Sequence, residues 1–142
     1  MNQIPLISNA CNNLIEAFYG RWQVTRSIHD RLGLGRITFE GEAVIGPDHF
    51  EEHGETLING HRSRSRRAYK ISLADAEVIV QFPDGREFIR LGASPLQRVR
   101  HLCGEDDYQG RLLFSSHAFW MESWDVVGPR KSYRSIARYR RD

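Results

Sequence analysis

Hydrophobic and polar residues alternate with a period of two along most of the chain, from about residue 20 to about residue 140. This period predicts β-strands that bury one face and leave the other in solvent. Glycine, proline, asparagine and aspartate residues interrupt the alternation often enough to predict roughly eight to ten short strands joined by turns. The expected strands cover residues 22–28, 37–43, 50–58, 62–73, 77–82, 86–91, 99–103, 108–115, 119–127 and 132–140.

A helical period precedes the strands. Leu14, Ile15 and Phe18 fall on one face of a helix, and Gly20 is a natural helix end. A helix this short has little stability in water by itself and needs a surface to pack on. The pattern therefore predicts a short N-terminal helix over residues 9–19 that lies against the strands.

Short turns between consecutive strands favour an antiparallel up-and-down arrangement over the long crossovers of a Greek key. Asn59-Gly60 is the clearest turn, because both residues accept the positive φ of a tight two-residue hairpin. Closing the sheet into a barrel removes exposed strand edges, and a barrel of about eight strands has room for one small ligand. We therefore expect an all-β barrel in a single domain over residues 1–142, with the barrel itself at about residues 20–140.

Composition fits this interpretation and limits the cellular setting. The 142 residues are 40% hydrophobic and 27% charged, which is typical of a globular domain. No apolar run approaches the roughly 20 residues of a membrane helix, and the first residues lack the pattern of a secretion signal. Cys11 and Cys103 suggest no disulfide framework. We expect a cytoplasmic protein with free thiols and no membrane partner.

Basic residues cluster in two segments, although the net charge is only +2. Arg62, Arg64 and Arg66 alternate on one expected strand, and six further basic residues lie between residues 130 and 141. Such clusters attract phosphates in nucleic-acid-binding proteins, but they more often form the solvated faces of strands. An interaction module with a basic outer strand is therefore one alternative, and nucleic acid is not the expected partner.

Gly20-Arg21-Trp22 opens the first expected strand directly after the expected helix, and it resembles the G-x-W signature of lipocalins and related calycins. The resemblance implies a tryptophan buried at the bottom of a barrel. It also implies a basic side chain near the last strand that packs across this tryptophan. Arg134 or Arg138 is the expected basic residue.

A longer series of motifs resembles a family of uncharacterised, calycin-like proteins known only as a domain of unknown function. In order, the motifs are Gly20-x-Trp22, Arg67-x-Tyr69, D-G-R-x-F at residues 84–88, H-x-C-x-x-D-x-Y at residues 101–108 and W-x-V-x-G-P-R-K-x-Y at residues 124–133. Their order over residues 20–139 is more specific than any one of them. The resemblance implies a lipocalin-like fold and, since the family has no known function, no activity.

Strand alternation places Arg26 and Arg67 on the faces that carry the apolar side chains. A buried guanidinium group keeps its charge and therefore needs a carboxylate, water or an anionic ligand. Two alternatives follow. Either the arginines form an internal ion-pair network with Glu122, Asp106 or Asp30, or they bind the carboxylate or phosphate of a ligand in bidentate fashion.

The leading hypothesis is a small-molecule-binding protein that encloses an amphipathic, anionic ligand, with two arginines at its charged end and aromatic side chains along its apolar part. No cofactor is expected, and a homodimer is an open alternative. The expected ligand-binding residues are Arg26, Arg67, Tyr69, Phe88, His101, Cys103, Tyr108, Trp120, Glu122, Trp124 and Tyr133.

An enzyme of the isomerase, lyase or hydrolase type is the alternative on the same barrel, with His101, Asp106 and Tyr108 as acid–base groups. No motif identifies a reaction, so we expect a binding protein rather than an enzyme. His101, Cys103 and Asp106 do not match the ligand spacing of known zinc sites, and we expect no metal. A buried Cys103 beside a structural hydrogen bond between His101 and Asp106 explains the same residues.

Overall fold

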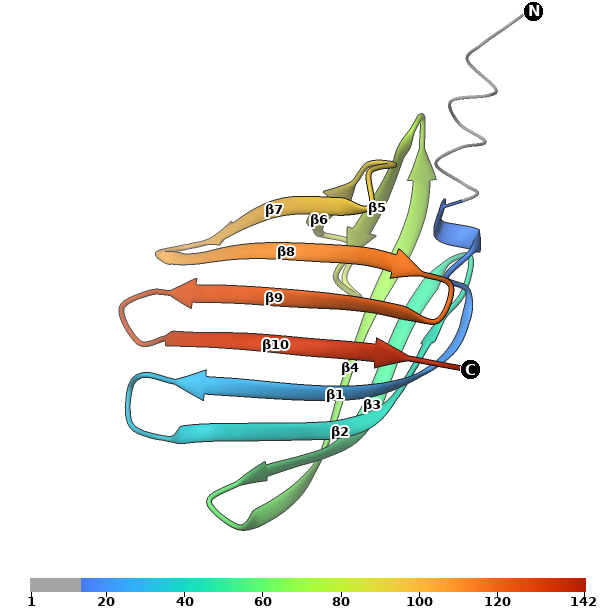
Figure 1. Cartoon of the computed structure of the whole chain (residues 1–142). Coiled ribbons are helices and arrows are strands. Elements are labelled where there is room, and N and C mark those ends of the chain that lie inside the picture. Colours follow the sequence, from blue (N-terminus) through green and yellow to red (C-terminus); the bar gives the residue numbers. More distant parts are fainter. Residues whose placement is uncertain (1–13) are drawn as a thin grey trace, which may run out of the picture.

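The computed structural model describes residues 14–142, and antiparallel β-strands account for most of them (Figure 1). Ten strands follow one another through short connections, at the upper end of the expected number. The strands are β1 (Gly20–Asp30), β2 (Gly35–Ile45), β3 (His49–Ile58), β4 (His61–Ala74), β5 (Glu77–Gln81), β6 (Glu87–Leu91), β7 (Leu96–Cys103), β8 (Asp106–Ser116), β9 (Phe119–Val127) and β10 (Ser132–Arg140).

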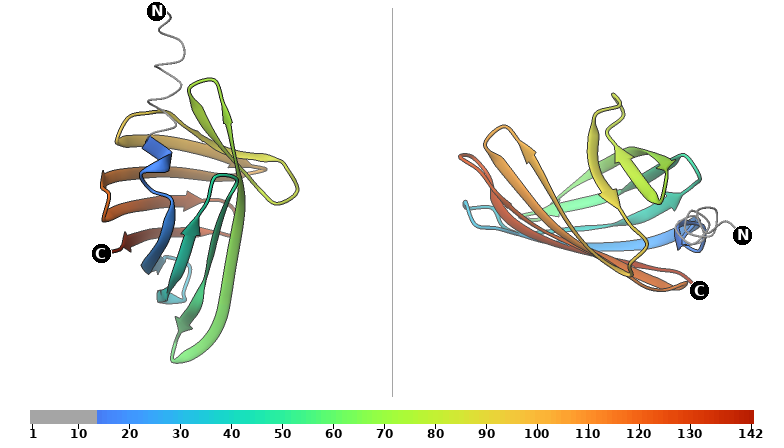
Figure 2. Two further views of the ribbon diagram at one scale, coloured as in Figure 1. Left: turned by 90° about the vertical axis from the view of Figure 1, so that its right-hand side faces the viewer. Right: turned by 90° about the horizontal axis from the view of Figure 1, so that it is seen from above.

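All ten strands belong to one sheet with the order β6-β5-β4-β3-β2-β1-β10-β9-β8-β7. The first strand therefore pairs with the last, and every other pair is consecutive along the chain. β6 and β7 lie next to each other without ladder hydrogen bonds, which leaves one seam in the barrel. Figure 2 shows the strands arranged around a common interior. The structure confirms an all-β up-and-down barrel with a short N-terminal helix.

Two short-range features explain how the sheet turns and bends. Asn59 and Gly60 have φ values of 50° and 82°, so the expected tight hairpin between β3 and β4 is confirmed. Gly41 and Gly54 are paired in register on β2 and β3. A Cβ atom on either glycine would lie 2.1 Å from a backbone carbonyl oxygen of the opposite strand. Only glycine fits this close approach, which lets the two strands bend together.

The floor of the barrel is built around Trp22, which is fully buried. Its Nε1 donates a hydrogen bond to the carbonyl oxygen of Phe18 at 3.0 Å, and the guanidinium carbon of Arg141 lies 4.0 Å from the centre of its ring. The same guanidinium group donates hydrogen bonds to the carbonyl oxygens of Ala17, Tyr19 and His117. Arg141 thus ties together the N-terminal segment, the end of the last strand and the turn between β8 and β9.

The basic residue that covers Trp22 is Arg141, and the expectation of Arg134 or Arg138 is wrong. On β10, inward positions have odd numbers, as the buried Tyr139 shows, while Arg134 and Arg138 are exposed on the outer face. Arg141 lies just beyond the end of β10, two positions after the buried Tyr139, so its side chain is on the inward side of the barrel. It can therefore turn back across the floor of the barrel.

Helical structure within the described residues is a single turn at residues 14–16. Ile15 and Phe18 are buried against the barrel, and the Phe18 ring stacks on Trp22 with 5.9 Å between ring centres. The apolar face of the expected helix is therefore confirmed, while residues 9–13 of that helix lie outside the described residues. Within residues 14–142, no helix has the length and apolar character required to cross a membrane.

We expect Arg141→Met to lower the free energy of unfolding by about 2 kcal/mol, because three carbonyl oxygens lose a charged donor and Trp22 loses its cation. Urea denaturation followed by tryptophan fluorescence measures this change. Arg138→Met is the control, because Arg138 is exposed on the outside of the same strand. Its expected effect is below about 0.5 kcal/mol. Equal losses in the two variants would contradict the role of Arg141.

Candidate functional site

Two arginines and two glutamates meet in the middle of the barrel. Arg26 of β1 donates to one carboxylate oxygen of Glu52 of β3 at 2.7 Å, and Arg67 of β4 donates to the other at 2.5 Å. Arg67 also donates to Glu122 of β9 at 2.5 Å. The hydroxyl of Tyr139 of β10 accepts hydrogen bonds from both arginines, at 3.0 and 2.8 Å, and donates to Glu52 at 3.0 Å. These five residues form the central network.

The two carboxylates and the tyrosine of the central network are buried, its two arginines are partly buried, and its charges balance. Glu52 and Tyr139 are 1% and 0% exposed. Burial by itself raises the pKa of Glu52, but the guanidinium groups of Arg67 and Arg26 outweigh it and hold that pKa below its usual value. Burial, reinforced by the negative charge of Glu122, raises the pKa of Tyr139 well above its usual value. Two positive and two negative charges therefore surround a neutral phenol at neutral pH.

The internal ion-pair alternative is confirmed for Glu122 but not for the other two carboxylates considered. Asp30 accepts a hydrogen bond from the backbone N–H of Leu34 in the turn after β1. Asp106 lies 3.6 Å from the ammonium group of Lys131, away from the central network. Both aspartates are located near the ends of their strands, where the chain leaves the barrel wall.

Sequence reasoning missed Glu52 and Tyr139. Glu52 pairs in register with Arg67 and follows the buried Phe50 by two positions on β3, so alternation along that strand was the available signal. It was hard to recognise because the strand is mostly polar. Tyr139 follows Tyr133 by six positions on β10, and the same alternation places both on the inward face.

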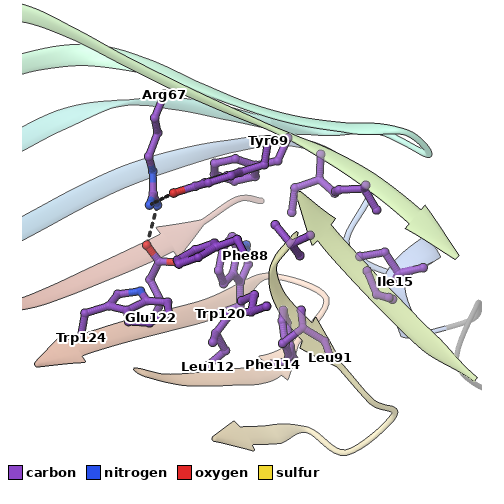
Figure 3. A pocket seen from close by; sticks show the side chains of 16 residues that line it. Ile15, Arg67, Tyr69, Phe88, Leu91, Leu112, Phe114, Trp120, Glu122 and Trp124 are labelled. Carbon is purple, nitrogen blue, oxygen red and sulfur yellow. Dashed lines mark hydrogen bonds and ion pairs between the residues drawn. The ribbon is translucent and has the colours of Figure 1, made fainter. Parts of the chain in front are cut away.

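On the floor side of the Arg67–Glu122 pair lies an apolar cavity of about 70 Å³, the inner cavity (Figure 3). Aliphatic side chains of β4, β5 and β6 and aromatic side chains of β8 and β9 form its walls, and Ile15 of the helical turn also lines it. Gly110 of β8 makes room for Trp124, because a Cβ atom there would lie 2.7 Å from the indole ring. The aromatic residues lining the inner cavity are Phe50, Tyr69, Phe88, Phe114, Trp120 and Trp124.

On the other side of the pair, toward the end of β1 and the start of β10, lies a more polar cavity of about 190 Å³, the outer cavity. Arg26 and four hydroxyl-bearing residues help to line it, and these four are Tyr69, Tyr108, Tyr133 and Ser135. The two cavities adjoin, because five residues line both. The shared residues are Arg67, Tyr69, Phe88, Glu122 and Trp124.

All of the expected ligand-binding residues except His101 and Cys103 line one of these two cavities. The imidazole ring of His101 packs against Phe82 and Phe88, with ring centres 5.6 and 5.2 Å apart, and so bridges the seam between β7 and β6. Cys103 is exposed at the end of β7, so the expectation that it is buried is wrong. It lies at the turn into β8, where side chains leave the barrel wall. Cys11 lies outside the described residues.

The acid–base group expected from His101, Asp106 and Tyr108 is not assembled. The rings of His101 and Tyr108 lie 6.2 Å apart, and the Tyr108 hydroxyl accepts a hydrogen bond from Lys131 at 2.9 Å. Among residues 14–142, no hydrogen bond joins His101 to Asp106, so the expected structural bond between them is absent. No group of three or more His, Cys, Asp or Glu residues in the described part of the chain could hold a metal ion.

Arg62, Arg64 and Arg66 of β4 are exposed on the outer face of the barrel, as expected. Arg62 pairs with Glu55 of β3 at 3.2 Å, and Arg66 pairs with Glu51 of the same strand. Two of these three outward arginines of β4 are therefore compensated on the barrel surface. This pairing weakens the interaction-module alternative, because the strand does not present a free basic row.

A model for a family of unknown function, DUF6314, matches residues 18–141. The chain belongs to this family. The match covers all ten strands and the whole central network, and it confirms the resemblance to a family without an assigned function.

Solved structures share the barrel at low sequence identity. The S-type phycobiliprotein lyase CPES from Guillardia theta superposes with a TM-score of 0.55 at 11% identity, covering 100% of this chain and 98% of that chain. A protein of unknown function from the DUF3598 family of Nostoc punctiforme superposes with a TM-score of 0.60 at 8% identity over 90% of this chain. This chain covers 49%, about half, of that protein. No curated protein matches. These likenesses show the fold alone.

We expect Arg67→Met to lower the free energy of unfolding by about 3–5 kcal/mol, because Glu52 and Glu122 lose a buried partner. Adding Glu122→Leu is expected to restore most of this loss, because Arg26 and Glu52 then remain as a neutral pair. Urea denaturation of the wild type, both single variants and the double variant measures the coupling. If the free energy of unfolding lost in the double variant equals the sum of the losses in the two single variants, the idea that balanced charges stabilise the central network is wrong.

The lowered pKa of Glu52 gives a second expectation. Its carboxylate stabilises the fold above the usual carboxyl pKa of about 4.3, and this contribution is lost as the pH falls through the lower folded-state value. The difference in unfolding free energy between the wild type and Glu52→Gln should therefore be largest at neutral pH and shrink below about pH 4. Urea denaturation across this range measures it, with the exposed Glu55→Gln as control. A difference that stays constant with pH would contradict this account.

Proposed function

We propose that this protein binds a small amphipathic molecule inside the barrel, with the anionic end of the molecule in the outer cavity. The observation that carries the proposal is the outer cavity itself, where two arginines and four hydroxyl groups face a space of about 190 Å³. Small-molecule sites are typically concave and apolar, with a few convergent polar groups that orient the ligand. The adjoining inner cavity provides the apolar part of such a site.

The two arginines have donors that the central network does not use. The hydrogen bonds of Arg26 to Glu52 and Tyr139 both use Nη2. Arg26 borders the outer cavity and also an adjoining hollow of about 110 Å³. Nη1 of Arg67 has only a long 3.5 Å contact with the hydroxyl of Tyr69 among the described residues. These remaining N–H groups are available to an acceptor on a ligand.

The tyrosines of the outer cavity supply further donors. Burial raises the pKa of Tyr69 and that of Tyr133, so both hydroxyls stay protonated and can donate. Lys131 donates to the hydroxyl of Tyr108 from the rim. A carboxylate or a similar strong acceptor matches this set of donors better than a cation does. Because the central network is balanced in charge, the anion is held by directed hydrogen bonds and not by a net positive charge.

Octanoate is therefore expected to bind about tenfold more tightly than octanol at neutral pH, because only its carboxylate accepts charge-assisted hydrogen bonds from the arginines. Titration calorimetry of the two probes measures this preference. The double variant Arg26→Met with Glu52→Gln removes one arginine and keeps the remaining Arg67–Glu122 pair neutral. It is expected to lose the preference for octanoate while octanol still binds.

Arg64→Met is the matched control, because Arg64 faces outward from β4. This variant should keep the full preference for octanoate. An unchanged preference in the Arg26/Glu52 double variant would contradict the assignment of the anionic end. Binding of neither probe to the wild type would contradict the outer cavity as a binding site for amphipathic molecules. Native mass spectrometry after exposure to a cell extract then identifies the natural ligand as an added mass that denaturation removes.

A further inference from the structure

A surface hollow of about 430 Å³ lies on the outer face of the barrel wall formed by β7, β8, β9 and β10, which run side by side (Figure 1). Its volume is in the range of typical small-molecule sites and exceeds that of the inner or the outer cavity. The polar side chains that line the surface hollow include Arg98, Arg100, Gln109, Arg111, Ser123 and Arg134.

The register of the strands brings three of these side chains into one row across the wall. Arg98 of β7 pairs with Arg111 of β8, and Arg111 pairs with Ser123 of β9. Directly opposite side chains on one face of a sheet have Cβ atoms about 4.5–5.5 Å apart, so the two guanidinium groups can converge on one point beside the short side chain of Ser123. Arg134 lies two positions along β10 from Ile136, the partner of Ser123, and therefore faces the hollow from the next row.

Arg98 and Arg111 repel each other, and the chain supplies no counter-charge for them. Among residues 14–142, neither of them forms an ion pair or a side-chain hydrogen bond, and the same holds for Arg134. Residues 1–13 contain no aspartate or glutamate. Like charges placed directly opposite each other on neighbouring strands destabilise a sheet. An anion held between the two arginines removes this repulsion.

The acidic residues nearest to the surface hollow are already engaged with other arginines. Asp107 accepts two hydrogen bonds from Arg100, at 2.9 and 3.0 Å. Asp125 forms an ion pair with Arg31 at 3.2 Å. In the described lining, four arginines stand against the single carboxylate of Asp125. The other three arginines of the lining therefore give the hollow an excess of positive charge.

We propose that the surface hollow binds the diphosphate group of a small molecule, with one phosphate between Arg98 and Arg111 and the second facing Arg134. Arginine binds phosphate in bidentate fashion, and a phosphate has enough oxygens to accept hydrogen bonds from two arginines at once. A carboxylate has two oxygens and one negative charge, which a single arginine satisfies. This site lies outside the barrel and is independent of the proposed function.

The lining favours a small molecule over a nucleic acid strand. Among the described residues of the hollow, the one aromatic side chain is that of Trp124, which is 7% exposed and stacks on Phe88. Proteins that bind single strands without sequence preference rely on aromatic side chains on which successive bases stack. The hollow therefore offers directed donors for phosphate groups without a platform for bases.

Titration calorimetry with inorganic pyrophosphate and orthophosphate, at one fixed ionic strength, tests the site. We expect pyrophosphate to bind about tenfold more tightly, because it reaches Arg134 as well as the pair of Arg98 and Arg111. Arg98→Gln and Arg111→Gln should each weaken pyrophosphate binding about tenfold, through the loss of one charge-assisted contact. Arg134→Gln should weaken the binding of pyrophosphate and leave that of orthophosphate unchanged.

Arg138→Gln is the matched control, because Arg138 is exposed on the outer face of β10, as Arg134 is, but does not line the hollow. This variant removes the same charge and should keep the wild-type affinity for pyrophosphate. An equal loss in Arg138→Gln and Arg98→Gln would show diffuse attraction to a basic surface and would overturn the proposal. Equal affinities of the wild type for the two anions would also overturn it.

Thermal unfolding supplies a second readout. Saturating pyrophosphate should raise the Tm of the wild type and of Arg138→Gln, because the anion binds only the folded hollow, and should have little effect on the Tm of Arg98→Gln. A wild type that pyrophosphate does not stabilise would contradict the site. A single-stranded oligonucleotide that displaces pyrophosphate and binds more tightly than it does would assign the surface to nucleic acid and overturn the small-molecule proposal.

Discussion

The ion pairs that join Arg26 and Arg67 to Glu52 and Glu122 are the constraint on which the barrel interior depends. They link strands from both halves of the chain, and the hydroxyl of Tyr139 completes them from the last strand. A buried charge without its partner is far more costly than the pair is stabilising. The four charges must therefore be brought together as the sheet closes, and the pairing of β1 with β10 places Arg26 beside Tyr139.

The central network also divides the interior by chemistry. Toward Trp22 the side chains are aliphatic and aromatic, and the space is small and apolar. Toward the opposite end, tyrosine hydroxyls and unused guanidinium donors surround a larger space. Because the two cavities share walls, one ligand can contact both. Such a ligand would combine a strong acceptor at the outer end with an apolar group at the inner end.

Local regularities explain why much of this arrangement could be predicted. Alternation placed Arg26 and Arg67 on the inward faces before any partner was known, because successive side chains of a strand point to opposite faces. Asn59-Gly60 fixed one hairpin through its backbone preferences. Arg141 was missed because it lies one residue beyond β10, and its reach back across the floor of the barrel does not follow from the strand itself. Glu52 was missed because β3 is mostly polar, so the alternation that places Glu52 on the same face as Phe50 is hard to recognise.

The sequence by itself determined the strands, their inward faces, the up-and-down order and the presence of two inward arginines, because these follow from periodicity and turn chemistry. Only the tertiary structure decided which carboxylates neutralise Arg26 and Arg67, since Glu52 and Glu122 come from strands far apart in the chain. It also separated His101 from Asp106. Partner choice inside a barrel depends on register and curvature, which sum over all ten strands and which no single segment encodes.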